Sequence, residues 1–306
     1  MQVITGKDFI IEEPCAIAIG KFDGIHKGHQ WILDELLKAG EKQLKTVVLS
    51  FEPSPEVYFG RQEAHFVLTE QEKQDMLASM GIDYYILYPF HAETAKMEAE
   101  VFLEEVLLKQ LNMKHLVAGD DLSFGYKGKG NGVFLKERET KYGYTFKLFP
   151  KLKIEDEVVS ASSLRTAILS GNIKKCTLFM GREFEMSGTV CKGNQIGHKL
   201  GFPTCNFVPS EEKLLPPKGV YVTLCDVDGK TYPSVTNVGV KPTVEGESQL
   251  GIECHLLDCD MDLYGKEICV RYLSFLRPEK KFNSLDALSE QIKADKEKAK
   301  MYFEKQ

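Results

Sequence analysis

The segment Gly20–His29 carries residue types that could act on a phosphate group. Its sequence, GKFDGIHKGH, joins two histidines in His-x-Gly-His spacing, His26 and His29, to a glycine-rich turn. An apolar run at 15–19 precedes it and an amphipathic run at 31–39 follows it, which predicts a strand, a tight turn and then a helix. Because the first turn of a helix presents unpaired N–H groups and a partial positive charge, the segment predicts a phosphate site to which two imidazoles are added.

The elements that must position this segment alternate between apolar runs and helical patterns over the first half of the chain. This alternation predicts a parallel sheet covered by helices, in which ligands bind at the carboxyl ends of the strands. A capping box at Thr69 and Glu72 marks the start of one helix, which ends before Gly81. The other expected helices are 31–39, 99–111 and 133–142, and the expected strands are 16–20, 46–51, 84–88, 115–118 and 144–148.

The pattern changes after residues 170–172 to short β-prone runs separated by glycine and proline. The pair Asp228-Gly229 predicts a hairpin, and the whole stretch predicts a small antiparallel barrel. A helix beginning near Leu285 with Ser284 as its cap is expected to close the chain. We expect Leu285, Leu288 and Ile292 on its core face. The expected strands are 188–191, 220–227, 230–238, 251–257 and 267–275, and the expected domains are 1–180 and 181–306.

Composition limits the classes of partner. The 306 residues carry a net charge of −6, which argues against nucleic-acid or membrane-surface binding. No run approaches the ~18 apolar residues of a membrane span, and the first residues lack the pattern of a secretory leader. The eight cysteines form no Cys-x-x-Cys pair, so they predict buried free thiols in a reducing cytoplasm and fit a zinc site poorly.

Further motifs in the first half carry a family resemblance. The lead-in Gly-x-Phe-Asp-Gly joins three segments, FEPSP at 51–55, GDDLSFG at 119–125 and VSASSLR at 159–165. Together they resemble the adenylyltransferase half of prokaryotic bifunctional riboflavin kinase/FAD synthetases. Ser54 stands where that family has histidine, and Leu122 where it has an aromatic residue.

This resemblance implies transfer of AMP from ATP to FMN, with release of pyrophosphate. It implies that His26 and His29 are catalytic, and it assigns Asp121 and Phe124 to flavin binding. Lys127 and Lys129 are expected near phosphates, in a mobile loop. The residues implied to bind ATP or its phosphates are Gly20, Phe22, Asp23, Gly24, Gly28, Ser162 and Arg165.

The second half has its own signature, GFPTCN at residues 201–206, which resembles the flavokinase element of the same family. The resemblance implies that Thr204 and Asn206 bind Mg²⁺ and ATP phosphates, and that Glu253 is the base for the riboflavin 5′-hydroxyl. His255 is expected to be structural. His198 stands where the family usually has arginine. Glycines expected to supply phosphate-binding N–H groups are Gly188, Gly193 and Gly201.

We therefore expect a cytoplasmic bifunctional transferase with an α/β Rossmann-like nucleotidyltransferase domain and a small β-barrel kinase domain. Its expected small molecules are riboflavin, FMN, FAD, ATP and Mg²⁺, with no nucleic-acid or membrane partner and an open oligomeric state. The substitutions at Ser54, Leu122 and His198 leave two alternatives: the same fold with only the adenylyltransferase activity, or a non-catalytic flavin-binding regulator. A cytidylyltransferase acting on a small alcohol phosphate would explain only the first half.

Overall fold

The computed structural model describes residues 1–41, 43–61, 63, 65–191, 202–242, 248–259 and 261–305. By its internal contacts the chain divides into two compact units, Met1–Ala161 and Ser162–Gln306. Helix α8 (Ile173–Met180) and all but the first residue of helix α7 (Ala161–Leu169) therefore fall in the second unit. The domain boundary expected at residue 180 stays a prediction.

The first unit contains a six-stranded sheet in the order β1-β4-β3-β2-β5-β6, and every pairing in it is parallel. The expected parallel sheet is confirmed. The first strand is short and mostly exposed, so it lacked the apolar run that revealed the others. The strands are β1 (Gln2–Thr5), β2 (Cys15–Ile19), β3 (Lys45–Glu52), β4 (Tyr84–Pro89), β5 (Met113–Gly119) and β6 (Thr145–Phe149).

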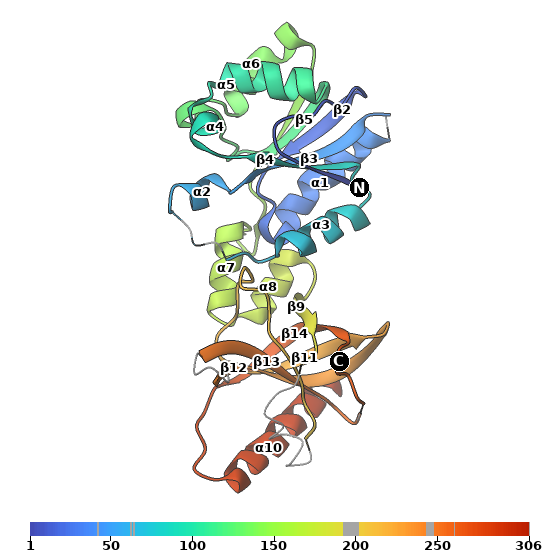
Figure 1. The fold of residues 1–306 in the computed structure, drawn as a ribbon, viewed down its shortest axis with the longest axis vertical. Helices are drawn as coiled ribbons and strands as arrows, with labels where there is room; N and C mark the ends of the chain where they lie inside the picture. The colour runs from blue at the N-terminus through green and yellow to red at the C-terminus, as the bar shows by residue number, and fades with distance from the viewer. Residues whose placement is uncertain are drawn as a thin grey trace. The chain divides into compact units, whose positions relative to one another are not determined.

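Both faces of this sheet are buried. Along β2, Ala16 and Ala18 belong to one apolar cluster while Ile17 and Ile19 belong to another. The helices α1 (Lys27–Gly40) and α3 (Glu70–Ser79) cover the first face, and α5 (Ala99–Val101), the π-helix η2 (Phe102–Gln110) and α6 (Gly132–Tyr142) cover the second (Figure 1). A strand buried on both faces reads as a continuous apolar run, which is why the central strands could be predicted.

Local signals set the helix ends. The Thr69 hydroxyl accepts from the Glu72 N–H at 3.2 Å and the Glu72 carboxylate accepts from the Thr69 N–H at 2.8 Å, so the expected capping box is confirmed. The shorter elements of this unit are η1 (Asp23–Ile25), α2 (Pro55–Tyr58), α4 (Ala92–Lys96), η3 (Tyr126–Gly128), β7 (Lys153–Ile154) and β8 (Glu157–Val158).

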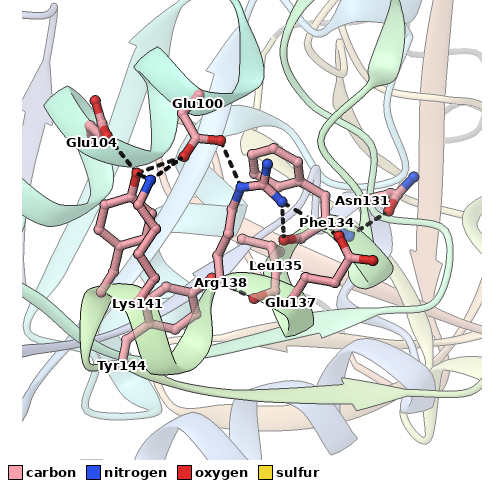
Figure 2. A network of polar contacts seen from close by, with 10 residues as sticks. Glu100, Glu104, Asn131, Phe134, Leu135, Glu137, Arg138, Lys141 and Tyr144 are labelled. Atoms are coloured by element: carbon pink, nitrogen blue, oxygen red, sulfur yellow. Dashed lines mark hydrogen bonds and ion pairs between the residues drawn. The ribbon is translucent and has the colours of Figure 1, made fainter.

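A polar network joins α6 to α5 and η2 (Figure 2). The Glu100 carboxylate accepts from the Tyr142 hydroxyl at 2.6 Å, from Arg138 Nε at 2.6 Å and from Lys141 Nζ at 3.2 Å. These hydrogen bonds, that from Tyr142 first, lower the pKa of Glu100 to about 2. The Tyr142 hydroxyl also contacts Glu104, so one carboxylate and one phenol link three helical segments.

The second unit is built on a six-stranded antiparallel sheet in the order β10-β13-β12-β11-β14-β9. A bridge between Cys191, just after β9, and Asn206 in β10 joins the two edges, so the sheet closes as a barrel. The hairpin expected at Asp228-Gly229 is confirmed, with both residues at positive φ. The strands are β9 (Phe184–Thr189), β10 (Cys205–Phe207), β11 (Gly219–Val227), β12 (Lys230–Pro242), β13 (Ser248–Leu256) and β14 (Glu267–Pro278).

The terminal helix α10 (Leu285–Phe303) begins as expected, because the Ser284 hydroxyl accepts from the Ala287 N–H at 3.1 Å. One expectation about its core face was wrong, since Leu285 is 62% exposed in the first turn. Asp295 and Ala299 are the buried positions of this helix instead. Asp295 pairs with Arg277 of β14 through both Nε and Nη2, at 2.9 and 2.7 Å, so an ion pair as well as apolar packing holds α10 against the barrel.

We predict that Glu100→Gln lowers the free energy of unfolding of the first unit by about 1 kcal/mol at neutral pH, because partly exposed ion pairs are screened by water. The folded pKa of Glu100 lies below its ordinary value, so its contribution is present above that value and is lost as pH falls toward about 2. The difference between wild type and variant should therefore shrink on acidification.

Urea unfolding followed by fluorescence of Trp31, the single tryptophan, reports on the first unit. Glu137→Gln is the matched control, because the Glu137 carboxylate pairs with Arg138 Nη1 at the longer distance of 3.7 Å. A Glu100→Gln deficit that stayed constant from about pH 7 to about pH 3 would contradict the assignment.

Candidate functional site

The first candidate site lies where the strand order of the parallel sheet reverses. Strand β2 sits between β3 and β5, so the loops that follow β2 and β5 leave the sheet in opposite directions. Open α/β sheets bind ligands in the crevice outside the carboxyl ends of strands at such a point. The segment Gly20–His29 follows β2 and the segment 119–125 follows β5, so both predicted motifs reach this crevice.

The two histidines lie together at the start of α1. His26 is the N-cap of the helix, and its Nδ1 accepts from the His29 N–H at 3.2 Å. The rings stack with centroids 3.7 Å apart and planes within 14°. Because His26 Nδ1 accepts a hydrogen bond, a neutral His26 carries its proton on Nε2. The pair is thus fixed beside the positive end of a helix.

The turn before the helix needs unusual backbone geometry. Phe22 adopts φ 51° and Gly24 φ 79°, and both residues are buried. At Gly28 a Cβ atom would lie 3.2 Å from the His26 ring, so a side chain there would push on the imidazole. At Gly20 a Cβ would lie 3.1 Å from the Phe22 ring. These glycines keep the rings and backbone in close contact.

Asp23 has a structural partner beyond the turn. Its Oδ1 accepts from the backbone N–H groups of Val67 and Leu68, at 2.8 and 3.4 Å, while its side chain is buried. These bonds tie the turn to the segment that leads into α3. Its predicted role in ATP binding stays a prediction, and positioning of the turn is the role that the geometry supports.

The structure also places Lys73 of α3 near the histidines. Burial, the neighbouring His26 and the Lys73 ammonium together hold the pKa of His29 well below its ordinary value, so His29 is neutral at neutral pH. Lys73 pairs with Glu70 at 2.8 Å, and its side chain is only 12% exposed. The sequence did not reveal this residue, because a lysine three positions after a glutamate resembles an ordinary surface pair on a helix.

The flavin residues expected after β5 have different environments. Phe124 is buried, with its ring 5.4 Å from that of Phe102 and 5.9 Å from that of Phe134, and it also belongs to the core. Asp121 is exposed and pairs with Lys151 at 3.5 Å. Both roles in flavin binding stay predictions, and Asp121 is the better placed to meet a ligand.

The loop after Phe124 is held by several contacts. Lys127 lies over the Tyr126 ring at 5.2 Å, and Lys129 pairs with Glu98 at 3.5 Å. Of the two positions that depart from the family in this unit, Ser54 is the buried N-cap of α2 and Leu122 packs against the core. Ser162 and Arg165 lie on α7 in the second unit, and their contact with ATP stays a prediction.

The second candidate site is a row of residues across the closed sheet. Asn206 of β10 pairs with Glu253 of β13, Glu253 with Asn237 of β12, Asn237 with Val220 of β11, and Val220 with Arg277 of β14. Directly paired residues of antiparallel strands point to the same face. Strand register therefore brings two amides, a carboxylate and a guanidinium to one surface from four strands, with Val220 of β11 between them.

Two cavities meet at Thr204 and Asn206. One, of about 270 Å³, is lined by the whole row and by residues of α10, including the half-buried Leu288 and Ile292. The other, of about 290 Å³, is lined by the segment before β10, by β10 and β13, by Cys259 and by residues 261–264. Glu253 opens only onto the first cavity, whereas Thr204 and Asn206 line both. Two ligands could thus meet at these two side chains.

Other predicted residues of this unit are placed as follows. Gly188 lies in β9, where a Cβ would lie 2.5 Å from the Phe207 ring. Close packing against this ring therefore explains why a glycine stands at this position. His255 is buried, and its Nδ1 lies 2.8 Å from the Pro203 carbonyl oxygen, which agrees with the expected structural role. Gly193, His198 and Gly201 lie outside the described residues. Site roles for Asn237 and Arg277 were missed, since only strand register shows that they share a face with Glu253.

Comparison with known proteins assigns both halves. The model of the FAD synthetase family matches residues 8–163, and that of the riboflavin kinase family matches residues 180–303. The bifunctional riboflavin kinase/FMN adenylyltransferase of Escherichia coli is 36% identical over 309 residues, which cover 99% of this chain and 98% of the relative. The chain belongs to the bifunctional riboflavin kinase/FMN adenylyltransferase family. The family member from Bacillus subtilis is 32% identical over 98% of this chain and 97% of the relative.

A solved structure shares the fold of this family member over almost its full length. It is a crystal structure described as a macrolide-efflux protein from Streptococcus pneumoniae, with a TM-score of 0.87, 30% identity, and coverage of 97% of this chain and 98% of that one. Within the part of the chain that the structure describes, no helix has the length and apolar character needed to cross a membrane.

We predict that Lys73→Met raises the pKa of His29, because it removes a positive charge that disfavours a second one nearby. The pKa should still remain below its ordinary value, since burial is the largest cause of the shift. Histidine ring resonances followed by NMR across a pH series measure this directly. Lys38→Met, at the other end of α1, is the matched control, and an unchanged His29 titration in Lys73→Met would refute the electrostatic link.

Proposed function

We propose that this chain makes FMN from riboflavin in its second unit and FAD from FMN in its first. The observation that carries the proposal is that each half has a separate site of its own. A stacked histidine pair stands at the switch point of the parallel sheet, and in the barrel the Glu253 carboxylate opens onto one of two cavities that meet at Thr204 and Asn206. Membership of the family supports both activities.

In the kinase reaction, the riboflavin 5′-hydroxyl oxygen attacks the γ-phosphorus of ATP. The bond from that phosphorus to the bridging oxygen breaks, ADP leaves, and Glu253 takes the hydroxyl proton. We assign riboflavin to the 270 Å³ cavity because Glu253 opens there, beside Phe202 and the α10 side chains. ATP then occupies the 290 Å³ cavity, so that its phosphates reach Thr204 and Asn206. A base must stand within hydrogen-bond reach of the proton it removes.

The residues between the cavities fit Mg²⁺. A threonine hydroxyl and an amide oxygen are hard ligands, and the Asn206 amide nitrogen donates to the Thr204 carbonyl at 3.3 Å, so that bond does not use its amide oxygen. When bound, the ion would neutralise charge on the transferring phosphoryl group. Thr204 and Asn206 would hold it, while Glu253 acts on the hydroxyl from the neighbouring strand.

In the adenylyltransferase reaction, a phosphate oxygen of FMN attacks the α-phosphorus of ATP. The bond to the α,β-bridging oxygen breaks and pyrophosphate leaves, so the chain need not supply a nucleophile. Negative charge accumulates on the α-phosphate and the leaving group. The N-terminus of α1 and the N–H groups of two fixed imidazoles stabilise such charge without reorganising during the reaction. A neutral His29 suits this role, because it can donate a hydrogen bond and needs no acidic partner.

We also propose a cytoplasmic location. All eight cysteines are free thiols, and one of them, Cys191, is exposed. Reduced thiols of this kind are typical of a reducing compartment, where the flavin substrates and ATP would also be available.

We predict that the two activities separate by mutation. His29→Ala should lower FAD formation from FMN by at least about 100-fold, the usual loss for one transition-state donor, while leaving FMN formation from riboflavin intact. Glu253→Gln should do the reverse, since it keeps the shape of the side chain but removes the base. Chromatography of flavins after incubation with ATP and Mg²⁺, starting from each flavin in turn, measures both.

Each variant is the control for the other, because each should retain one activity of wild type. Wild-type protein that makes FAD from FMN but no FMN from riboflavin would support the single-activity alternative. Wild-type protein that binds both flavins without turning either over would support the regulator, and this proposal would then be wrong.

A further inference from the structure

Three thiols converge inside the barrel. They lie on the opposite face of the sheet from the row that contains Asn206 and Glu253, which we call the catalytic row. Cys205 of β10, Cys225 of β11 and Cys254 of β13 are all buried, at 8%, 0% and 0% exposure. Their sulfur atoms all lie within 4.8 Å of one another. Cys205 and Cys254 are directly paired residues of adjacent strands, and the closed sheet brings Cys225 to them across the interior.

The sulfur spacing matches a site for one thiophilic metal ion. With a metal–sulfur distance of about 2.3 Å, three thiolates around one ion lie about 4 Å from each other. The cluster therefore needs closure by less than about 1 Å at its widest spacing. Soft thiolate ligands select ions such as Cu⁺, Zn²⁺ and their heavier congener Cd²⁺ over the hard Mg²⁺.

Polar groups surround the sulfur atoms in this otherwise apolar interior. The buried hydroxyl of Thr223 lies 2.8 Å from that of Ser234 and 2.7 Å from that of Thr236, and Thr236 is the strand partner of Cys254. Tyr272 is the strand partner of Thr223 in β14, and its hydroxyl is buried without a hydrogen-bond partner among the described residues. An apolar core would not need these groups, whereas outer hydroxyls can orient the ligands of a metal.

An access route leads to the cluster. The 290 Å³ cavity is lined by both Cys205 and Cys254, and also by Cys259 and Met261. Cys259 is half-buried, so it can meet an incoming ion before the buried pair does. A soft ion entering this cavity would therefore pass from a thiol and a thioether to the three-sulfur cluster.

We propose that Cys205, Cys225 and Cys254 form a binding site for one thiophilic metal ion inside the barrel. Binding forms three metal–sulfur bonds and releases the thiol protons to solvent, with no change of oxidation state. The site is separate from the Mg²⁺ position proposed for the kinase, which uses oxygen ligands on the other face of the same strands.

The site should also control the kinase half, a consequence that rests on the proposed function. Cys205 lies between Thr204 and Asn206, and Cys254 follows Glu253. Drawing the sulfur atoms together moves the two strand segments that carry these three side chains. Because small displacements of catalytic groups cost large factors in rate, the loaded protein should phosphorylate riboflavin at least about 10-fold more slowly.

Cd²⁺ is the probe for the test, because its thiolates give a charge-transfer absorption band in the ultraviolet. The full chain, reduced with a phosphine and freed of metals under argon, is titrated with CdCl₂. We expect the band to saturate at one equivalent. Cys225→Ser and Cys205→Ser should each weaken binding by at least about 10-fold. Cys269→Ser is the matched control, because Cys269 contacts Glu185 outside the cluster and should leave the titration unchanged.

The β-sheet signal in the circular dichroism of each metal-free variant, and the thermal midpoint at which that signal is lost, show that its barrel has folded. No band at one equivalent, or an unchanged band in folded Cys225→Ser, would overturn the site. The gel-filtered cadmium protein is then assayed for both reactions: slowed phosphorylation with normal adenylylation supports the control of the kinase. A band with unchanged phosphorylation would keep the site and refute only that control. Failure of the proposed function shows separately, as a metal-free protein that lacks activity.

Discussion

Adjacent residues of a strand must point to opposite faces of a sheet, and this alternation sets what the barrel can do. Asn206 and Glu253 point outward as a directly paired couple, and Cys205 and Cys254, one position away, point inward as another. A shift of one residue in the register of β10 against β13 would set Cys205 opposite Glu253 and turn Asn206 to the interior, so it would break both couples. The hairpin at Asp228-Gly229 and the bridge from Cys191 to Asn206 therefore support the chemistry indirectly, because they fix the register of the strands around the closed sheet.

The first unit must place its polar groups in another way than the barrel does, because neither face of its sheet is free. Apolar clusters cover both sides of β2, so polar groups can gather only beyond the strand ends. The chain must then reverse within a few residues and begin a helix, which is why Phe22 and Gly24 adopt positive φ and why His26 is both helix cap and candidate catalytic group. The cap hydrogen bond and the ring stacking fix the same side chain, so helix initiation and site geometry depend on each other.

Much of the fold followed from the sequence where a local signal was strong. Buried parallel strands, the Thr69 capping box, the hairpin and the Ser284 cap each have a signature within a few residues. Strand β10, with only three residues, has none, and the exposure of Leu285 shows that an apolar side chain in a first helical turn can extend beyond the surface that the helix covers.

The residues of the candidate sites also divide into those with a local sequence signal and those without one. Motif residues such as His26 and Glu253 could be named from the chain, and the structure adds Lys73, Asn237 and Arg277. Each of these comes from a separate element, so no spacing in the sequence reveals it.

The cysteines show most clearly why the spacing of residues in a sequence cannot reveal a site built from separate strands. Zinc motifs are recognisable because their ligands come in pairs a few residues apart on one turn or hairpin. The ligand positions at 205, 225 and 254 are about 20 to 30 residues apart and lie on three strands. Closure of the barrel alone brings them within 4.8 Å. Because Cys205 and Cys254 each adjoin a residue of the catalytic row, any change at these positions acts on the barrel interior and on the kinase site together. A replacement that suits the core must therefore also keep the polar couple in place.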